Sequence, residues 1–421
     1  MKPILLLVVL VTPSILLGQE NDALQEMTLD QAVARAVEAA PIVSTAEGAV
    51  FAAQGRRAQV TWPFAANPTV EFERTRRRSP GGEVYDVGWR FGQSFEISGS
   101  SLRSREAAET RVMASEAYVG DAIRRASLEA RVVYAALHLS EQRAALSATN
   151  AELAAELATL ARRQLDAGEI NVLAYNTAAL EAARALSLAD RLEGERRAAQ
   201  AELARVLAVG GDRVIRTTAL PTLPAEIPGI DVLMASAVRR RPDLNAVTLE
   251  VDAATENLTA NRRRRFPTLE LAVFEGEEDG TDDLLGLSLG VSLPLFQRNQ
   301  GDVGAARAEQ AAAEARSAAT IRAIRSQVDG WAERYKGASS AERRFADELL
   351  LASLDNVELA GRAFQEGELS VADVVVFRST ALATQLEYLE VLAEAYEAWF
   401  QLAAAVDARP DELTDLAGAQ S

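Results

Sequence analysis

The sequence contains no cysteine, one histidine and few aromatic residues, which make up 5% of the chain. Without cysteine there is no disulfide, no zinc–thiolate site, no thiol nucleophile and no acylated N-terminal cysteine. The single histidine, His138, leaves little for acid–base catalysis or for a selective transition-metal site, which needs several such ligands. No catalytic triad or phosphate-binding loop is present either, so we expect neither an enzyme, nor a bound metal, nor a cofactor.

Positive charge and long apolar runs are also scarce. Lys and Arg number 44 against 61 Asp and Glu, and the net charge of -17 argues against a nucleic-acid partner, which needs a basic face. The start of the chain, Met1 and Lys2 followed by an apolar run to Leu17, predicts a secretory signal. No later stretch approaches the roughly 18 apolar residues of a spanning helix, so any membrane span must consist of strands.

The chain is instead rich in alanine and in long stretches without proline. Hydrophobic residues reach 48%, a composition that favours long, closely packed helices. Residues 102–165 and 301–364 contain no proline, and each helix would be roughly 95 Å long at 1.5 Å per residue. Coiled-coil spacing is visible in the second stretch, at Leu350, Leu354, Val357, Gly361 and Phe364.

The sequence repeats itself at a spacing of about 200 residues, the size of a domain rather than of a solenoid unit. Three segments recur: residues 29–37 as 230–238, each followed by a proline, residues 68–72 as 267–271, and residues 167–172 as 366–371. Each half therefore predicts the same order of a helix, a strand pair, a very long helix, a tight turn at Gly168 or Gly367, and a returning helix.

The predicted strands alternate between apolar and small or polar residues. Leu285, Leu287 and Leu289 alternate with glycine and serine, and Tyr85 to Phe91 shows the same period of two. Strands of about 8 to 12 residues suit a tilted crossing of a bilayer. A hairpin packed on a soluble core is the alternative, but no helix offers an apolar face broad enough to cover these strands.

The predicted organisation follows from these elements. It is a signal peptide at 1–18, a first repeat at 19–209, an equatorial linker at 210–229, a second repeat at 230–408 and a C-terminal tail at 409–421. The first repeat holds strands at about 69–78 and 84–96, a long helix at about 102–165 and a return helix at about 173–208. The second holds strands at about 268–275 and 284–293, a long helix at about 301–364 and a return helix at about 372–407.

Four strands cannot close a barrel, and lipid does not tolerate open sheet edges. Two copies would supply eight strands, whose interior is filled by side chains, and three copies would supply twelve strands around an aqueous pore. The residues alone permit either.

Beyond residue 18 the chain resembles TolC-type outer-membrane efflux proteins over essentially its whole length. The residues that carry the resemblance are the duplicated openings at Asp30 and Asp231, residues 267–269 before a strand, residues 293–296 before a long helix, and the turns at Gly168 and Gly367. Residues 67–69 and 95–99 are most similar to the cobalt–zinc–cadmium (heavy-metal) branch.

The resemblance implies a mainly α fold with a membrane β part. A homotrimer would form a twelve-stranded β-barrel, four strands per chain, continuous with a long α-helical barrel. It implies a gated exit duct in the outer membrane of a Gram-negative bacterium, with most of its mass in the periplasm. The implied partners are outer-membrane lipid, a periplasmic adaptor (membrane fusion) protein and an inner-membrane pump of the resistance-nodulation-division type, from which substrates pass to the exterior. A periplasmic coiled-coil scaffold or tether, and a duct for type I protein secretion, remain alternatives.

The resemblance also implies where the aperture gate lies. Acidic residues shortly after the second turn ring the aperture in that family, and the matching position here is Asp373. The equivalent residue of the first half, Ala174, is not acidic, which suggests a less charged constriction. Glu169 and Glu368 either compensate at the gate or favour the N-terminus of the returning helix.

The remaining candidate sites lie at the two ends of the predicted molecule. For the adaptor contact we select the turn residues Gly168, Ile170, Val172, Gly367, Leu369 and Val371, with ordinary turn packing as the alternative. Arg76, Arg77 and Arg78 approach the first extracellular turn, where they would bind lipopolysaccharide phosphates or form a solvated loop. His138 is most simply a helix-face residue.

Overall fold

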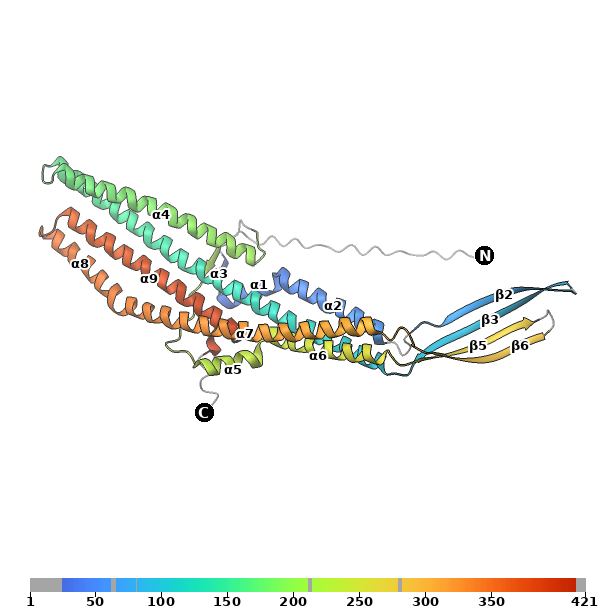
Figure 1. The fold of residues 1–421 in the computed structure, drawn as a ribbon. Helices are drawn as coiled ribbons and strands as arrows, with labels where there is room; N and C mark the ends of the chain where they lie inside the picture. Colours follow the sequence, from blue (N-terminus) through green and yellow to red (C-terminus); the bar gives the residue numbers. More distant parts are fainter. Residues whose placement is uncertain (1–24, 62–65, 81, 211–213, 279–281, 414–421) are drawn as a thin grey trace, which may run out of the picture.

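The computed structural model describes residues 25–61, 66–80, 82–210, 214–278 and 282–413. The predicted signal peptide and most of the predicted C-terminal tail lie outside these residues. In the described part, a long bundle of helices carries a sheet at one end and two helical turns at the other (Figure 1). Among the described residues no single helix has the length and hydropathy to span a membrane, although α1 and α2, bent by 45°, meet that test as a pair.

The same order of elements occurs twice. The first half contains α1 (Leu29–Ala39), α2 (Pro41–Thr61), β2 (Thr69–Ser79), β3 (Gly82–Glu96), α3 (Ser100–Asp166) and α4 (Val172–Val206). The second half contains α5 (Ile230–Arg240), α6 (Pro242–Arg263), β5 (Thr268–Glu278), β6 (Asp282–Ser292), α7 (Gln300–Arg344), a π-helical segment (Phe345–Leu350), α8 (Leu351–Gln365) and α9 (Val371–Ala405).

Short helices run beside the long ones in each half. α2 and α4 both pack along α3, and α6 and α9 both pack along α7 (Figure 1). Alanines fill the buried seam of α3, including Ala107, Ala126, Ala130 and Ala161. Small side chains allow helix axes to approach to the short end of the usual 8–10 Å range, so a chain with few aromatic residues still buries its helix faces.

The stretch predicted as a long helix at about 301–364 is helical from Gln300 to Gln365, but it is not α-helical throughout. A π-helical segment, Phe345–Leu350, separates α7 from α8, whereas α3 runs unbroken for 67 residues. The wider turn of a π-helix shifts the face that the following helix presents. Apolar heptad spacing continues on both sides of the segment, and hydrophobic spacing therefore gave no sign of the break.

The four strands at the far end form one antiparallel sheet in the order β2-β3-β5-β6. The two halves of the chain join at its centre, where Val87 to Glu96 of β3 pair with Thr268 to Glu277 of β5. Within the described residues β2 and β6 each have one strand neighbour, so the sheet has two open edges.

A second, small sheet lies beside the bundle at mid-length. β1 (Gln25–Met27) and β4 (Ile215–Thr217) pair in parallel. The fully buried Tyr134 of α3 connects them, because its hydroxyl donates to the Met27 carbonyl (2.7 Å) and accepts from the Thr218 N–H (2.8 Å). The largest apolar cluster of the described residues lies at a similar position along the bundle and contains Tyr335, Tyr396, Trp399 and Phe400.

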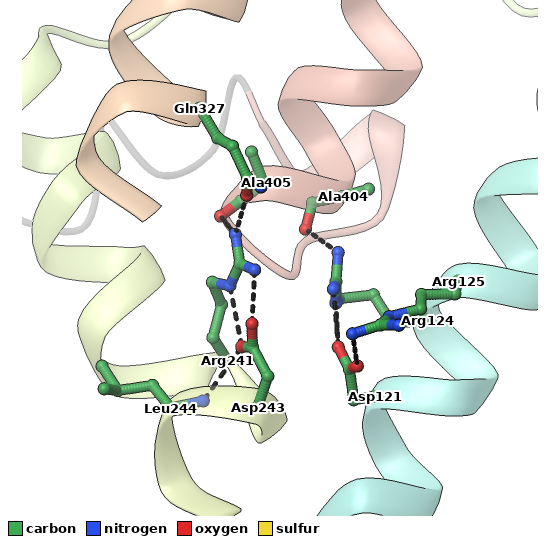
Figure 2. Close-up of polar contacts among 9 residues, drawn as sticks. All are labelled: Asp121, Arg124, Arg125, Arg241, Asp243, Leu244, Gln327, Ala404 and Ala405. Carbon is green, nitrogen blue, oxygen red and sulfur yellow. Dashed lines mark hydrogen bonds and ion pairs between the residues drawn. The ribbon is translucent and has the colours of Figure 1, made fainter. Parts of the chain in front are cut away.

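Two arginines hold the C-terminus of α9 in this middle region. Arg241 donates to the Ala405 carbonyl (3.1 Å) and pairs with Asp243 (2.6 Å), while Arg124 of α3 donates to the Ala404 carbonyl (3.1 Å) (Figure 2). The last carbonyls of a helix have no partner within the helix, and a cation near them also interacts favourably with the negative end of the helix dipole. These contacts join α3, α6 and α9 at one point.

Candidate functional site

Both helical turns at the end opposite the sheet are closed in the same way. Gly168 and Gly367 adopt φ angles of 77° and 78°, in the left-handed region. The next residue closes each turn, since Glu169 N–H donates to the Gln164 carbonyl and Glu368 N–H to the Ala363 carbonyl, both at 2.9 Å. This is the Schellman arrangement, and it fixes the geometry of both turns.

Asp373 belongs to the cap of the returning helix α9. Its carboxylate accepts hydrogen bonds from the Ser370 hydroxyl (2.6 Å) and the Ser370 N–H (3.0 Å), while the Ser370 hydroxyl accepts from Asp373 N–H (3.3 Å). The hydrogen bonds from the Ser370 side chain and backbone lower the pKa of Asp373. The carboxylate therefore remains charged and exposed at this end of the bundle, where the predicted gate lies.

Glu169 and Glu368 are exposed in the turns themselves. The side chains that cap the returning helices are instead Asn171, which accepts from Ala174 N–H at 2.9 Å, and Ser370. The two glutamates directly precede these caps, and Asp373 lies in the first turn of α9 after Ser370. Their part in a gate remains a prediction.

The tip residues selected for adaptor contact fall into two groups. Val371 is only 3% exposed, because it packs with Val374 and Val375 against Leu157 and Ala161 of the other hairpin. Selecting Val371 as a contact residue was therefore wrong, since apolar spacing shows that a residue faces a neighbour but not which one. Ile170 is half-buried against the same cluster, and Leu369 is also half-buried.

The exposed apolar surface at the tips includes the start of α4. Val172 is 60% exposed, Gly168 and Gly367 are exposed, and Leu173 is 74% exposed. Leu173 was absent from the sequence-based selection. A signal was available, because the buried residues Ala178, Ala185 and Leu192 recur every seven residues and Leu173 lies off that stripe.

The sheet has two chemically distinct faces. Register places on one face the apolar residues Val70, Phe72, Val87, Trp89, Phe91, Leu269, Leu271, Val273, Leu285, Leu287, Leu289 and Val291. The other face carries Thr69, Glu71, Glu73, Asp86, Gly88, Arg90, Gly92, Glu270, Ala272, Phe274, Gly276, Gly286, Ser288 and Gly290. Leu285 and Leu287 are 80% and 84% exposed, so in the described chain nothing covers the apolar face.

The three arginines predicted at the outer rim do not share one face. Arg76 and Arg78 lie on the apolar face, whereas Arg77 lies on the polar face and pairs with Asp86 (3.0 Å) and Glu278 (2.8 Å). Arg78 pairs with Glu83 at 2.8 Å. Any phosphate bound by Arg78 would compete with this carboxylate, and the binding of lipopolysaccharide by the three arginines stays a prediction.

His138 connects α3 to the small sheet. Its Nδ1 lies 2.8 Å from the Thr217 hydroxyl, and the Gln142 amide nitrogen lies 3.0 Å from its Nε2. Burial lowers the pKa of His138. In the part of the chain that the structure describes, no group of three or more His, Cys, Asp or Glu side chains is placed to hold a metal ion.

Known proteins resemble this chain in both sequence and fold. Residues 233–407 match the model of the family described as outer membrane efflux protein. Over most of its second half the chain is therefore similar to the outer membrane efflux proteins. The family's members are efflux channels, which agrees with the expectation that the chain is not an enzyme.

One curated protein to which the chain is similar is the cobalt-zinc-cadmium resistance protein CzcC of Cupriavidus metallidurans. It is 25% identical over 316 residues, which cover 72% of each chain. Two solved structures share the fold. A membrane protein from Pseudomonas aeruginosa has a TM-score of 0.76 at 17% identity, with 90% of this chain and 92% of that chain covered. The outer membrane protein VceC of Vibrio cholerae has a TM-score of 0.74 at 18% identity, covering 90% and 96%.

Proposed function

We propose that this protein is the exit duct of a tripartite efflux system in the outer membrane of a Gram-negative bacterium. It conducts substrates passively from an inner-membrane pump of the resistance-nodulation-division type, through a periplasmic adaptor and a gated aperture, to the exterior. The observation that carries the proposal is the two-faced sheet, whose uncovered apolar face and polar opposite face are typical of a barrel wall in lipid.

Strand length supports the insertion of this sheet. β5 and β6 each have 11 residues. At about 3.3 Å per residue and a tilt of roughly 40°, such strands rise about 28 Å, close to the apolar band of roughly 25 Å in outer-membrane barrels. The apolar row of β6, from Leu285 to Val291, falls within that band.

The open edges at β2 and β6 support a homotrimer. Unpaired backbone groups at an edge are not tolerated in lipid, so β6 of one copy must pair with β2 of the next. Three copies give twelve strands, whereas eight strands would leave an interior filled by side chains. The long helices would then continue the wall into the periplasm.

The turn end of the bundle is the natural place for the aperture and the adaptor. We propose Asp373, Glu368 and Glu169 as the acidic residues of the gate, and Gly168, Val172, Leu173, Gly367 and the partly exposed Leu369 as adaptor contacts. Exposed apolar residues on rigid turns suit a protein–protein contact, because little side-chain or backbone order is lost on binding.

For the cargo we propose heavy-metal cations, in line with the relative named for cobalt, zinc and cadmium resistance. The whole sequence has one histidine and no cysteine. Selective transition-metal binding needs more such ligands, so recognition of the metal would take place in the pump and the adaptor.

Heat-modifiable gel analysis of detergent-extracted outer membranes, combined with chemical crosslinking, tests the assembly. We expect a crosslinked ladder that ends at three subunits in the outer-membrane fraction. A soluble periplasmic monomer or dimer would contradict the proposal and favour a scaffold or tether.

A further inference from the structure

One cross-strand row of the polar face differs from its neighbours. Register aligns Glu71 with Arg90, Arg90 with Phe274, and Phe274 with Gly286, so the row crosses all four strands. The adjacent row toward the helices holds Thr69, Gly92, Ala272 and Ser288, and the adjacent row on the other side holds Glu73, Gly88, Gly276 and Leu284. The row from Glu71 to Gly286 is therefore the bulkiest of the three.

The side chains of this row contact one another across the sheet. The Arg90 Nε lies 3.8 Å from the Glu71 carboxylate, and the Arg90 guanidinium lies 5.8 Å from the centre of the Phe274 ring. Arg90 also reaches toward Ser288 of β6, at 3.5 Å between Nη1 and the hydroxyl oxygen. A cation at this distance from an aromatic face is attracted to it, so Arg90 lies across β5 rather than extending away from the sheet.

Gly286 provides the space in which the Phe274 ring lies. A Cβ atom built on Gly286 would be 2.2 Å from Cζ of Phe274, much closer than real contacts allow. The ring thus lies flat over the glycine, as aromatic side chains do over glycines of a neighbouring strand. A hollow of about 400 Å³ on the same face is lined by Glu71, Arg90 and Phe274, among others.

We infer that the row Glu71–Arg90–Phe274–Gly286 forms a selectivity ring inside the barrel, with Arg90 as its ion-discriminating residue and Phe274 as its steric one. The inference rests on the proposed trimeric barrel, in which the polar face lines the lumen. Three copies place three guanidinium groups, three carboxylates and three phenyl rings in one layer. Rings of charged side chains set the ion preference of channels. The layer lies apart from the gate predicted at the helical turns.

In that layer the positive charge of Arg90 neutralises the negative charge of Glu71. Removal of Arg90 therefore leaves three carboxylates, one per copy, without a neutralising charge. Glu73 and Glu270 lie on the same face in nearby rows and add to the negative potential. We therefore expect Arg90→Ala to raise the permeability of K⁺ relative to Cl⁻ by roughly fivefold. This is the factor that corresponds to the interaction of an ion with one unit charge about 4 Å away in water. Phe274→Ala should increase single-channel conductance, because it removes bulk without changing charge.

Gly286→Ala provides the opposite change in size. The added methyl group displaces the Phe274 ring from the wall into the lumen, and conductance should fall. The double variant Gly286→Ala with Phe274→Ala should restore it, because no ring remains to be displaced. Rescue of this kind is not expected if the alanine merely damages the sheet.

The experiment is planar-bilayer recording of the purified full-length trimer in KCl gradients. Arg74→Ala is the matched control, since Arg74 lies in the same sheet on the apolar face, over the Tyr85 ring at 4.5 Å. Altered selectivity in Arg90→Ala but not in Arg74→Ala supports the ring. If both variants conduct like the wild-type protein and have its ion selectivity, the selectivity ring is overturned, whereas the proposed duct is not. A wild-type protein that forms no channel contradicts the proposed function itself.

Discussion

At the scale of single residues, four helix ends use the same left-handed turn with different side chains. Gly168 and Gly367 adopt it at the tips, whereas Ala208 and Asp407 adopt it at the ends of α4 and α9 with φ angles of 50° and 51°. The left-handed region costs an L-residue about 1–2 kcal/mol, and glycine avoids that cost. The tips are therefore relaxed, and the two mid-length ends are strained.

This contrast predicts opposite effects for two reciprocal substitutions. Gly168→Ala should lower the free energy of unfolding of the helical bundle by about 1 kcal/mol, and Ala208→Gly should raise it by a similar amount. Chemical denaturation followed by circular dichroism measures both. If the two substitutions shift the midpoint in the same direction, backbone strain is not their main effect.

His138 predicts a pH dependence of stability. Burial lowers its pKa in the folded chain below the ordinary value of 6.5, while the nearby Glu141 raises it. Below about pH 6.5 the unfolded chain therefore binds a proton that the folded chain does not, and stability falls as the pH drops from 6.5 toward the folded pKa.

The histidine variant isolates this contribution from that of the carboxylates. We expect the midpoint difference between pH 7.5 and pH 5.5 to be smaller in His138→Gln than in the unsubstituted protein. Glutamine keeps polar atoms near Thr217 and does not titrate. An unchanged difference would show that His138 contributes nothing to the acid sensitivity.

At the scale of elements, the end of α9 depends on arginines from two other helices. Arg241 is 4% exposed and joins Asp243, Gln327 and the Ala405 carbonyl (Figure 2). The residue of the first half that aligns with Arg241 is Ala40, so only the second repeat has an arginine at this position to bond the end of a returning helix. Removal of one partner leaves buried charged and polar groups unpaired.

Arg241→Ala should therefore destabilise the protein by about 3–5 kcal/mol, the usual effect of breaking a buried ion pair. The exposed Arg239 in the same helical turn provides the control, and Arg239→Ala should change stability by about 0.5 kcal/mol or less. Thermal unfolding of the detergent-solubilised proteins distinguishes them. Equal losses would show that the buried pair is not the source of the effect.

At the scale of the whole molecule, β3 and β5 join the repeats into one sheet while the helices continue away from it (Figure 1). Neighbouring residues of β6 lie on opposite faces, which allows the membrane assignment to be tested within one strand. Leu287 lies on the apolar face and Ser288 on the polar face.

In the proposed trimeric barrel Leu287 faces lipid, so Leu287→Arg should reduce the yield of heat-modifiable trimer in the outer membrane, because arginine at the centre of the lipid costs about 2–4 kcal/mol. Ser288→Arg should leave the yield nearly unchanged, since it would face water in the lumen. Gel analysis of outer-membrane fractions gives both yields. Equal yields would contradict the assignment of the faces.

Local sequence alone determined much of this molecule. Proline-free alanine-rich stretches favour long helices, glycine permits the left-handed turns, and the period of two in β6 separates Leu287 from Ser288. The recurrence of the same segments showed that the module is duplicated. These features depend on backbone geometry and on neighbours a few residues away, which the sequence contains directly.

Only the tertiary structure decided which surfaces meet. Apolar spacing could not show that Val371 is buried against the other hairpin, because a stripe identifies no partner. The pairing of β3 with β5, and the row that brings Glu71, Arg90 and Phe274 together, also arise from contacts between distant segments. Such contacts depend on how whole helices and strands pack, and that packing is not encoded at any one position of the chain.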